Sequence, residues 1–110
     1  KSVNYPGLKS SPNYERVKAN FTEGLASGLL AFEVADEQTA LKVANGTEIF
    51  RVMVNIGDSK SIITHPASTT HAQLSKDEQL KAGISAGLIR LSVGLENADD
   101  LIEDLKKALA

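Results

Sequence analysis

Residues 88–93 read Leu-Ile-Arg-Leu-Ser-Val, and the fold follows from this stretch and its flanks. From the second residue on, apolar and polar side chains alternate, which is typical of a β-strand with one face toward an apolar core. One face of the predicted strand carries Ile89, Leu91 and Val93, and the other carries Leu88, Arg90 and Ser92. Two unlike faces favour an antiparallel sheet that is covered on one side.

Three more segments have the pattern of short strands: residues 28–34, 49–57 and 60–65. Residues 49–57 (IFRVMVNIG) alternate strictly, so we expect one strand through the whole segment. Its core face would carry Phe50, Val52, Val54 and Ile56, and its opposite face Arg51, Met53 and Asn55. In residues 28–34 the core face would carry Leu30, Phe32 and Val34. Residues 2–8 are expected to be extended, because Pro6 disfavours a helical conformation at the residue before it.

Four helices are predicted from capping residues and apolar periodicity. Their expected N-caps are Ser11, Asp36, Ser75 and Asn97. Their expected buried stripes are Tyr14, Val17 and Phe21 in the first helix, Ala40, Leu41 and Ala44 in the second, and Leu101, Ile102, Leu105 and Leu109 in the last. Strands and helices do not alternate strictly, which predicts an α+β domain. We expect a small, mostly antiparallel four-stranded sheet with its apolar face covered by the two longest helices.

The composition is that of one folded domain, residues 1–110. The chain is 42% apolar and 24% charged, with a formal net charge of −2. So balanced a charge argues against a nucleic-acid or anionic-lipid partner, and no window is apolar and long enough to span a membrane. The absence of cysteine excludes disulfides and thiol chemistry. Because the sequence starts at Lys1 in mid-pattern, we expect a fragment or a processed product.

The common catalytic motifs are absent. No phosphate-binding loop, dinucleotide fingerprint or nucleophile elbow occurs. His65 and His71 are six residues apart without an obvious third ligand, so we expect structural or solvated histidines and no metal site. Lys60 follows a polar turn, whereas a lysine that forms an imine needs a desolvated pocket. We therefore expect Lys60 to be solvated.

Arg90 and Asn55 are the candidate binding residues. Each is predicted to point away from the core from its own strand. A guanidinium and an amide that converge across strands can bind a carboxylate, because arginine offers a planar fork of two donors. The alternative from pattern alone is an arginine lying over the solvated face of the sheet. Both interpretations are open at this level.

Two blocks of the sequence resemble a known family. Residues 57–71 (GDSKSIITHPASTTH) and 86–97 (AGLIRLSVGLEN) are similar to the C-terminal signature of the Cys/Met-metabolism family of pyridoxal-phosphate (PLP) enzymes. Residues 3–14 (VNYPGLKSSPNY) resemble the start of that family's C-terminal domain. Within the family, Asn55 resembles the O-acetylhomoserine sulfhydrylase branch, since the γ-lyase branch usually has serine there. The Thr-Thr-His ending and the Ser-x-x-Glu-Gln-Leu continuation fit the same branch.

The resemblance implies the C-terminal domain of a fold-type-I PLP enzyme and a reaction for the parent protein. A sulfhydrylase (homocysteine synthase) converts O-acetylhomoserine and sulfide into homocysteine and acetate in methionine biosynthesis. The resemblance implies that Arg90 binds the α-carboxylate of this amino-acid substrate and that Asn55 helps to hold it. It implies no catalytic role for a residue of this chain. It also implies a cytoplasmic homotetramer.

The resemblance equally implies what this chain lacks. The family's Schiff-base lysine lies in a Ser-x-Thr-Lys motif, which does not occur here. The cofactor-binding residues belong to the family's preceding large domain. We therefore expect PLP in the full-length enzyme, no cofactor bound to this chain, and an inactive isolated chain whose partner is its own missing PLP-binding domain.

Three other functions stay open. The first alternative is the same domain of a methionine or cystathionine γ-lyase or of a cystathionine γ-synthase. A second reading, from another class, is a stand-alone module that binds an amino acid at Arg90 and Asn55. A third is a domain that only mediates assembly.

Overall fold

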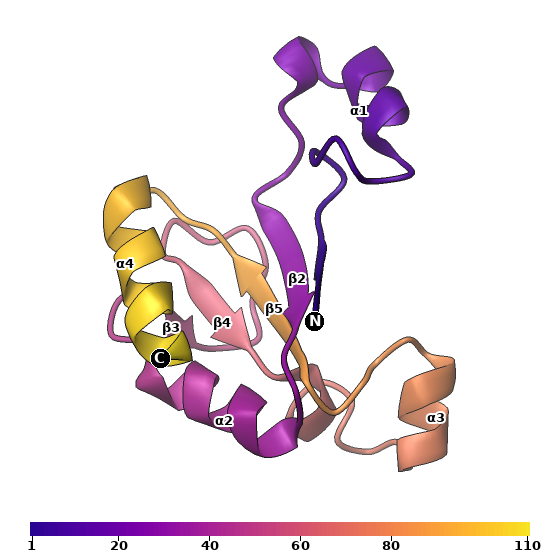
Figure 1. Ribbon diagram of the computed structural model, residues 1–110, viewed down its shortest axis with the longest axis vertical. Coiled ribbons are helices and arrows are strands. Elements are labelled where there is room, and N and C mark those ends of the chain that lie inside the picture. Colours follow the sequence, from indigo (N-terminus) through magenta and orange to yellow (C-terminus); the bar gives the residue numbers. More distant parts are fainter.

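The computed structural model describes residues 1–110, and a five-stranded sheet forms its centre (Figure 1). The strands are β1 (Ser2–Asn4), β2 (Leu29–Glu33), β3 (Arg51–Val52), β4 (Ile62–Thr64) and β5 (Leu88–Ser92), in the order β1-β2-β5-β4-β3. Three of the four strand pairs are antiparallel, and only β3 and β4 are parallel. The α+β class and the mostly antiparallel sheet are confirmed. The count of four strands was one too low, because residues 2–4 are not merely extended but pair with β2.

Two helices cover one face of the sheet, as expected. They are α2 (Glu37–Gly46) and α4 (Ala98–Leu109), the two longest, and they pack on each other (Figure 1). The short helices α1 (Tyr14–Asn20) and α3 (Lys76–Lys81) project from the sheet at other points. The chain also has two 3₁₀ turns, η1 (Thr22–Gly24) between α1 and β2 and η2 (Pro66–Ser68) between β4 and α3. None of the helices has the length and apolar character needed to cross a membrane.

Capping side chains start three of the helices at the predicted residues. The carboxylate of Asp36 accepts a hydrogen bond of 2.8 Å from the backbone N–H of Thr39 at the start of α2. Ser75 and Glu78 form a reciprocal capping box at α3. The side chain of Asn97 accepts from two backbone N–H groups at the start of α4. Caps are local interactions, so the sequence alone identifies them.

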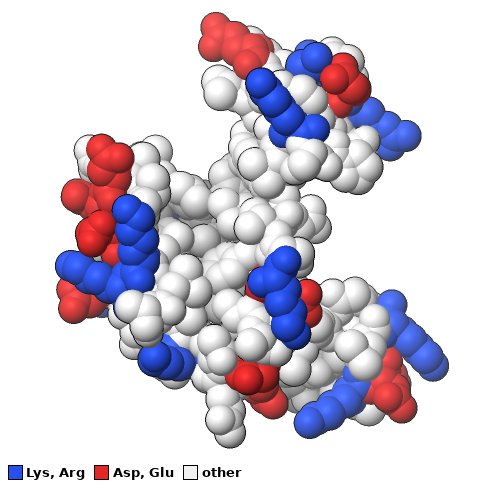
Figure 2. All heavy atoms as spheres, viewed as in Figure 1, with Lys and Arg blue, Asp and Glu red and all other residues white.

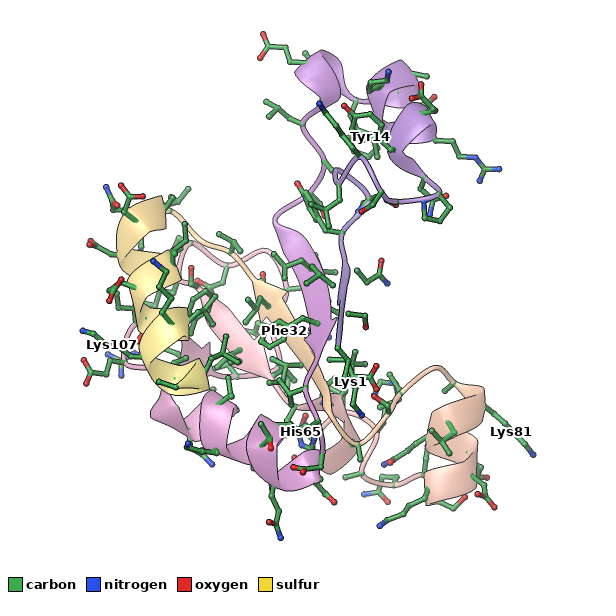
Figure 3. The ribbon with its side chains drawn as sticks, in the orientation of Figure 1. Lys1, Tyr14, Phe32, His65, Lys81 and Lys107 are labelled. Carbon is green, nitrogen blue, oxygen red and sulfur yellow. The ribbon has the colours of Figure 1, made fainter.

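The core lies between the sheet and the pair α2–α4. Its buried members are Val34, Ala40, Val43, Ala44, Phe50, Ile63, Ile89, Leu91, Leu101 and Ala108. Leu30 and Phe32 of β2 pack against this cluster, and Figure 3 shows Phe32 in the middle of the sheet. The predicted core face of residues 28–34 is therefore confirmed, and so are Ile89 and Leu91 of residues 88–93, whereas Val93 lies beyond the end of β5 and is exposed. Charged side chains lie mostly over the helices at the periphery, with both signs mixed (Figure 2).

Several predicted positions were wrong. The strand expected over residues 49–57 is only two residues long, and Val52, Val54 and Ile56 are each more than half exposed. The first helix starts after Asn13 rather than Ser11, and Phe21 ends it with an exposed ring. In α2, Val43 is buried in place of Leu41. In α4, Ile102 and Leu109 are exposed and Asp104 is buried instead. In residues 49–57 the error arises because the alternation of apolar side chains continues past the two residues that pair with β4.

Candidate functional site

Arg90 lies in the middle of the central strand β5. Its cross-strand neighbours are Ala31 of β2 and Thr64 of β4. The two residues that flank it, Ile89 and Leu91, belong to the core under the helices. Since successive side chains of a strand point to opposite faces, Arg90 lies on the sheet face away from α2 and α4. The predicted orientation of Arg90 is confirmed.

One end of the Arg90 guanidinium is held by the protein. Its Nη2 atom donates a hydrogen bond of 2.9 Å to the carbonyl oxygen of Val54, and the Thr64 hydroxyl lies 3.5 Å from the same nitrogen. The Nε atom is shielded from solvent and has no acceptor. Nη1 takes part in no hydrogen bond within the chain. The side chain is thus anchored at Nη2 and keeps donors that are not yet used.

A pocket of about 310 Å³ adjoins the Arg90 side chain. Its lining is formed by β1, β2 and the residues next to them, together with Arg90: Asn4, Pro6, Ser27, Leu29, Leu30 and Ala31. Arg90 is the only charged residue of this lining. The pocket therefore offers a positive charge to a small ligand that carries a negative one.

Asn55 lies beside this arginine, although not in the predicted way. The strand that was expected to orient it ends at Val52, so Asn55 belongs to an exposed segment without regular structure. The carbonyl that accepts from Arg90 is the one that precedes Asn55 in the chain. The structure therefore brings the two predicted residues together through the peptide link between Val54 and Asn55.

The signature residues after β5 join it firmly to β4. The Glu96 carboxylate accepts from the backbone N–H of Ser61 at 2.7 Å and from its hydroxyl at 2.7 Å. The Ser61 hydroxyl in turn accepts from the N–H of Gly94 at 2.8 Å. The backbone hydrogen bond from Ser61 is the main reason why the pKa of Glu96 lies below its usual value. These contacts hold β4 and β5 next to each other, and so they hold Thr64 next to Arg90.

His65 is a structural residue, as the sequence indicated. It is buried, and Figure 3 shows it inside the molecule near η2. Its Nε2 lies 2.7 Å from the carbonyl of Ala86 and its Nδ1 lies 2.7 Å from the hydroxyl of Ser68. Because a carbonyl only accepts, Nε2 donates to Ala86, while Nδ1 and the Ser68 hydroxyl form the second hydrogen bond of the ring. Both ring nitrogens are thereby satisfied. No three His, Cys, Asp or Glu side chains gather as a metal-binding group.

The sequence did not reveal the role of Asp104. Its carboxylate lies under residues 48–50 and accepts backbone hydrogen bonds from Glu48, Ile49 and Phe50 at 2.8, 2.9 and 3.1 Å. Burial raises the pKa of Asp104, but these three donors outweigh it, so the pKa lies below its usual value. The available signal was its position three residues after Leu101, on the buried side of α4. Asp104 lies on the helix side of the sheet and serves the fold rather than the Arg90 site.

The lysines of this chain do not fit covalent attachment of PLP. A lysine that forms an imine is activated by a desolvated pocket. Every lysine here is exposed, and Figure 3 shows Lys81 and Lys107 pointing away from the body of the molecule. Lys60, the one considered from its motif, is exposed as expected.

Comparison with known proteins gives a consistent result over the whole chain. The profile of the family described as Cys/Met metabolism PLP-dependent enzyme matches residues 1–110. The O-acetyl-L-homoserine sulfhydrylase of Leptospira meyeri is 48% identical over 108 residues, which cover 97% of this chain and 24% of that protein. The L-methionine gamma-lyase of Treponema denticola is 42% identical over 109 residues, 98% of this chain and 27% of that protein.

A crystal structure of a Campylobacter jejuni protein has the same fold. O-acetylhomoserine (thiol)-lyase activity has been ascribed to that protein, and it contains N′-pyridoxyl-lysine-5′-monophosphate. It superposes with a TM-score of 0.91 and 53% identity, over 99% of this chain and 26% of that one. The chain therefore spans about a quarter of the length of the relatives it matches.

Proposed function

This chain belongs to the Cys/Met-metabolism family of PLP-dependent enzymes, and we propose that it is the C-terminal domain that binds the substrate α-carboxylate in the full-length enzyme. The observation that carries the proposal is the state of Arg90: it is held at Nη2 by Val54, while its buried Nε has no acceptor. A buried donor without a partner is rare in folded proteins and calls for an explanation. A substrate carboxylate would bind at the accessible end of the guanidinium, where Nη1 has no acceptor within the chain.

The surroundings of Arg90 support the same ligand. The guanidinium is the only charge that lines its pocket, and the strand fixes its direction. A planar guanidinium binds a carboxylate through two parallel hydrogen bonds, which fixes orientation as well as position. Asn55 directly follows the Val54 carbonyl that accepts from Arg90, is exposed, and has an amide N–H₂ to offer. We propose that Arg90 is the main carboxylate ligand and that Asn55 assists it.

For the full-length enzyme we propose O-acetylhomoserine sulfhydrylase activity, in which O-acetylhomoserine and sulfide give homocysteine and acetate. It is supported by the 48% identity to the Leptospira meyeri sulfhydrylase and by asparagine at position 55. PLP, bound to residues outside this chain, would supply the electron sink for replacement at the γ-carbon. This chain would hold the carboxylate and so orient a substrate whose reactive end lies elsewhere.

A γ-lyase is the second candidate, because the Treponema denticola methionine gamma-lyase is 42% identical, only slightly less than the sulfhydrylase. The two activities are separated by assaying the full-length protein for homocysteine from O-acetylhomoserine and sulfide, and for 2-oxobutyrate from methionine. Efficient lyase activity without homocysteine synthesis would refute the sulfhydrylase assignment. A cytoplasmic homotetramer remains a prediction from the family.

Substitution of Arg90 in the full-length enzyme tests the carboxylate role. For Arg90→Ala we expect kcat/KM for O-acetylhomoserine to fall about 100-fold, because a hydrogen bond to a charged group contributes about 1.5–3 kcal/mol. Arg51→Ala is the matched control, because Arg51 is an exposed arginine on the edge strand β3. The proposal is wrong if the two variants have the same kcat/KM.

Binding assays on the isolated chain distinguish two hypotheses: a domain that binds the carboxylate only within the full-length enzyme, and a stand-alone module that binds an amino acid by itself. Without the walls that the rest of the enzyme provides, we expect no saturable binding of O-acetylhomoserine and no absorbance band of a lysine-bound cofactor in the presence of PLP. Saturable binding at micromolar concentration that is lost in Arg90→Ala would instead establish an independent amino-acid-binding module.

A further inference from the structure

We propose that Thr64 is a positioning residue for substrate binding: its hydroxyl holds the Arg90 guanidinium and the backbone of residues 53–55 in the arrangement that receives the carboxylate. The inference rests on the proposed function and extends it to a residue that touches neither substrate nor cofactor.

Thr64 and Arg90 are direct neighbours across the sheet. Thr64 is the last residue of β4, and its registered partner on β5 is Arg90 (Figure 1 shows the two strands side by side). Directly opposed residues of paired strands project from the same face. Thr64 is 1% exposed, so its hydroxyl does not have bulk water as a partner. A buried hydroxyl is costly unless the protein satisfies it.

The Thr64 hydroxyl is the hydrogen-bonding partner of two other groups, the Met53 carbonyl and Arg90 Nη2. It donates its single hydrogen to the carbonyl of Met53, which leaves its lone pairs to accept. The Nη2 atom of Arg90 lies 3.5 Å away in the direction of an acceptor, and the same nitrogen donates to Val54 at 2.9 Å. Nη2 has two hydrogens, one for each of these acceptors. The set Met53–Thr64–Arg90–Val54 is thus a closed ring of contacts.

The contacts of this ring hold residues 53–55, which follow β3 and belong to no strand. Beyond Val52 the chain leaves the sheet, and its last backbone contact with β4 is a hydrogen bond of 3.3 Å from Met53 N–H to the Ile63 carbonyl. The Thr64 hydroxyl adds the hydrogen bond to the Met53 carbonyl, one residue before the carbonyl that anchors Arg90 and two before Asn55. Without it, we expect both the segment and the guanidinium to sample other positions.

Packing alone does not require threonine at this position. The two preceding residues of β4 are Ile62 and Ile63, both buried, so valine would suit the strand and fill the same volume. Thr64→Val therefore removes the hydroxyl with little change of shape. A change in substrate binding can then be attributed to the lost hydrogen bonds of the Thr64 hydroxyl. These bonds position Arg90, which binds the substrate carboxylate in the proposed function.

The test measures binding to the full-length holoenzyme with two probes. L-Norvaline has an α-amino group and an α-carboxylate but no γ-leaving group, and n-butylamine has the amine without the carboxylate. For Thr64→Val we expect the dissociation constant of norvaline to rise about 10-fold, the size expected for one lost hydrogen-bonding group near a charge. That of butylamine should not change. In turnover, KM for O-acetylhomoserine should rise with kcat changed less than about threefold.

Three further variants sharpen the result. Thr64→Ser restores the hydroxyl and should recover most of the norvaline affinity. Thr64→Ala also lacks the hydroxyl and must show the same selective loss, whether or not Thr64→Val folds well. Thr47→Val is the matched control, because the Thr47 hydroxyl bonds to the Ala44 and Phe50 carbonyls on the helix side of the molecule. It should leave both dissociation constants unchanged.

The outcomes separate this inference from the proposed function. Equal weakening of norvaline and butylamine in Thr64→Val and Thr64→Ala, or no weakening of either, overturns the positioning role. The role is also overturned if Thr64→Val weakens norvaline as strongly in an Arg90→Ala background as in the wild type, since the effect must act through Arg90. If Arg90→Ala itself does not distinguish norvaline from butylamine, the proposed function fails instead.

Discussion

Asp104 illustrates how much one buried side chain stabilises this fold. Its carboxylate accepts from three consecutive backbone N–H groups of residues 48–50, in the segment that connects α2 to β3. In Asp104→Ala these donors lose their partner, so we expect the free energy of unfolding to fall by about 2–4 kcal/mol. Urea denaturation of the 110-residue chain measures it. Glu103→Ala, at an exposed neighbour on α4, should change the value by less than about 0.5 kcal/mol. Equal effects would contradict the role assigned to Asp104.

The same residue predicts how stability depends on pH. Folding holds the pKa of Asp104 below the value of about 3.9 that it has in an unfolded chain. In acid the unfolded state therefore binds more protons, so this contribution is complete above about pH 5 and is lost as the pH falls through the lower pKa of the folded state. We expect the free energy of unfolding of Asp104→Asn to fall less steeply between pH 5 and 2 than that of the wild type. Parallel curves would show that Asp104 contributes nothing to the acid transition.

At the scale of elements, the contact between the end of β5 and the start of β4 allows no side chain at residue 94. A Cβ on Gly94 would lie 2.3 Å from the Ser59 carbonyl oxygen and 2.7 Å from the Ser61 nitrogen, both backbone atoms that cannot rotate away. We expect Gly94→Ala to lower the free energy of unfolding by about 2–3 kcal/mol, as overpacking does. Gly46→Ala is the control, because its Cβ would meet Ala108 at an ordinary 3.6 Å and alanine favours the helix. The measured order should be Gly46→Ala at or above wild type, and Gly94→Ala well below it.

Which elements could be predicted from the sequence depends on the range of the interactions that make them. Helix α2 and helix α4 begin where Asp36 and Asn97 indicate, because a cap is decided within four residues. The segment 49–57 was predicted wrongly, because alternation describes a chain with two faces but not whether a partner strand exists beside it. Its pairing with β4 is limited to Arg51 and Val52.

The candidate site likewise has features that follow from local sequence and features that depend on distant residues. The direction of Arg90 follows from the period of its own strand and was predicted. Its contacts with Thr64 and Val54 join residues 26 and 36 positions away in the chain, so no local pattern contains them. In the sequence alone, Thr64 is a β-branched residue that indicates a strand and nothing more. Only the register between β4 and β5 shows that it faces Arg90.

At the scale of the whole molecule, stability should be unevenly distributed. Helix α1 is seven residues long, has Val17 as its one buried residue and packs chiefly against η1, apart from the sheet (Figure 1). A helix shorter than about 12–15 residues is marginal without tertiary packing. Helix α3 has six residues and none buried. By contrast, α4 buries Leu101, Asp104 and Ala108, and β5 lies at the centre of the sheet.

Amide hydrogen exchange of the 110-residue chain tests this distribution. We expect the amides of α1 and α3 to exchange at least about 100-fold faster than those of β5, because short, weakly packed helices open without unfolding the core. The amides of α4 should be protected like those of the sheet, which shows that fast exchange is not a property of every helix in the chain.

This uneven stability affects the pocket beside Arg90. The Arg90 pocket is lined by Asn4, Pro6 and Ser27, which flank the α1 region, and by the central strands. One wall of the pocket would then be able to move while the guanidinium stays fixed. Equal protection of α1 and β5 would instead make the chain one cooperative unit and the pocket rigid on both sides.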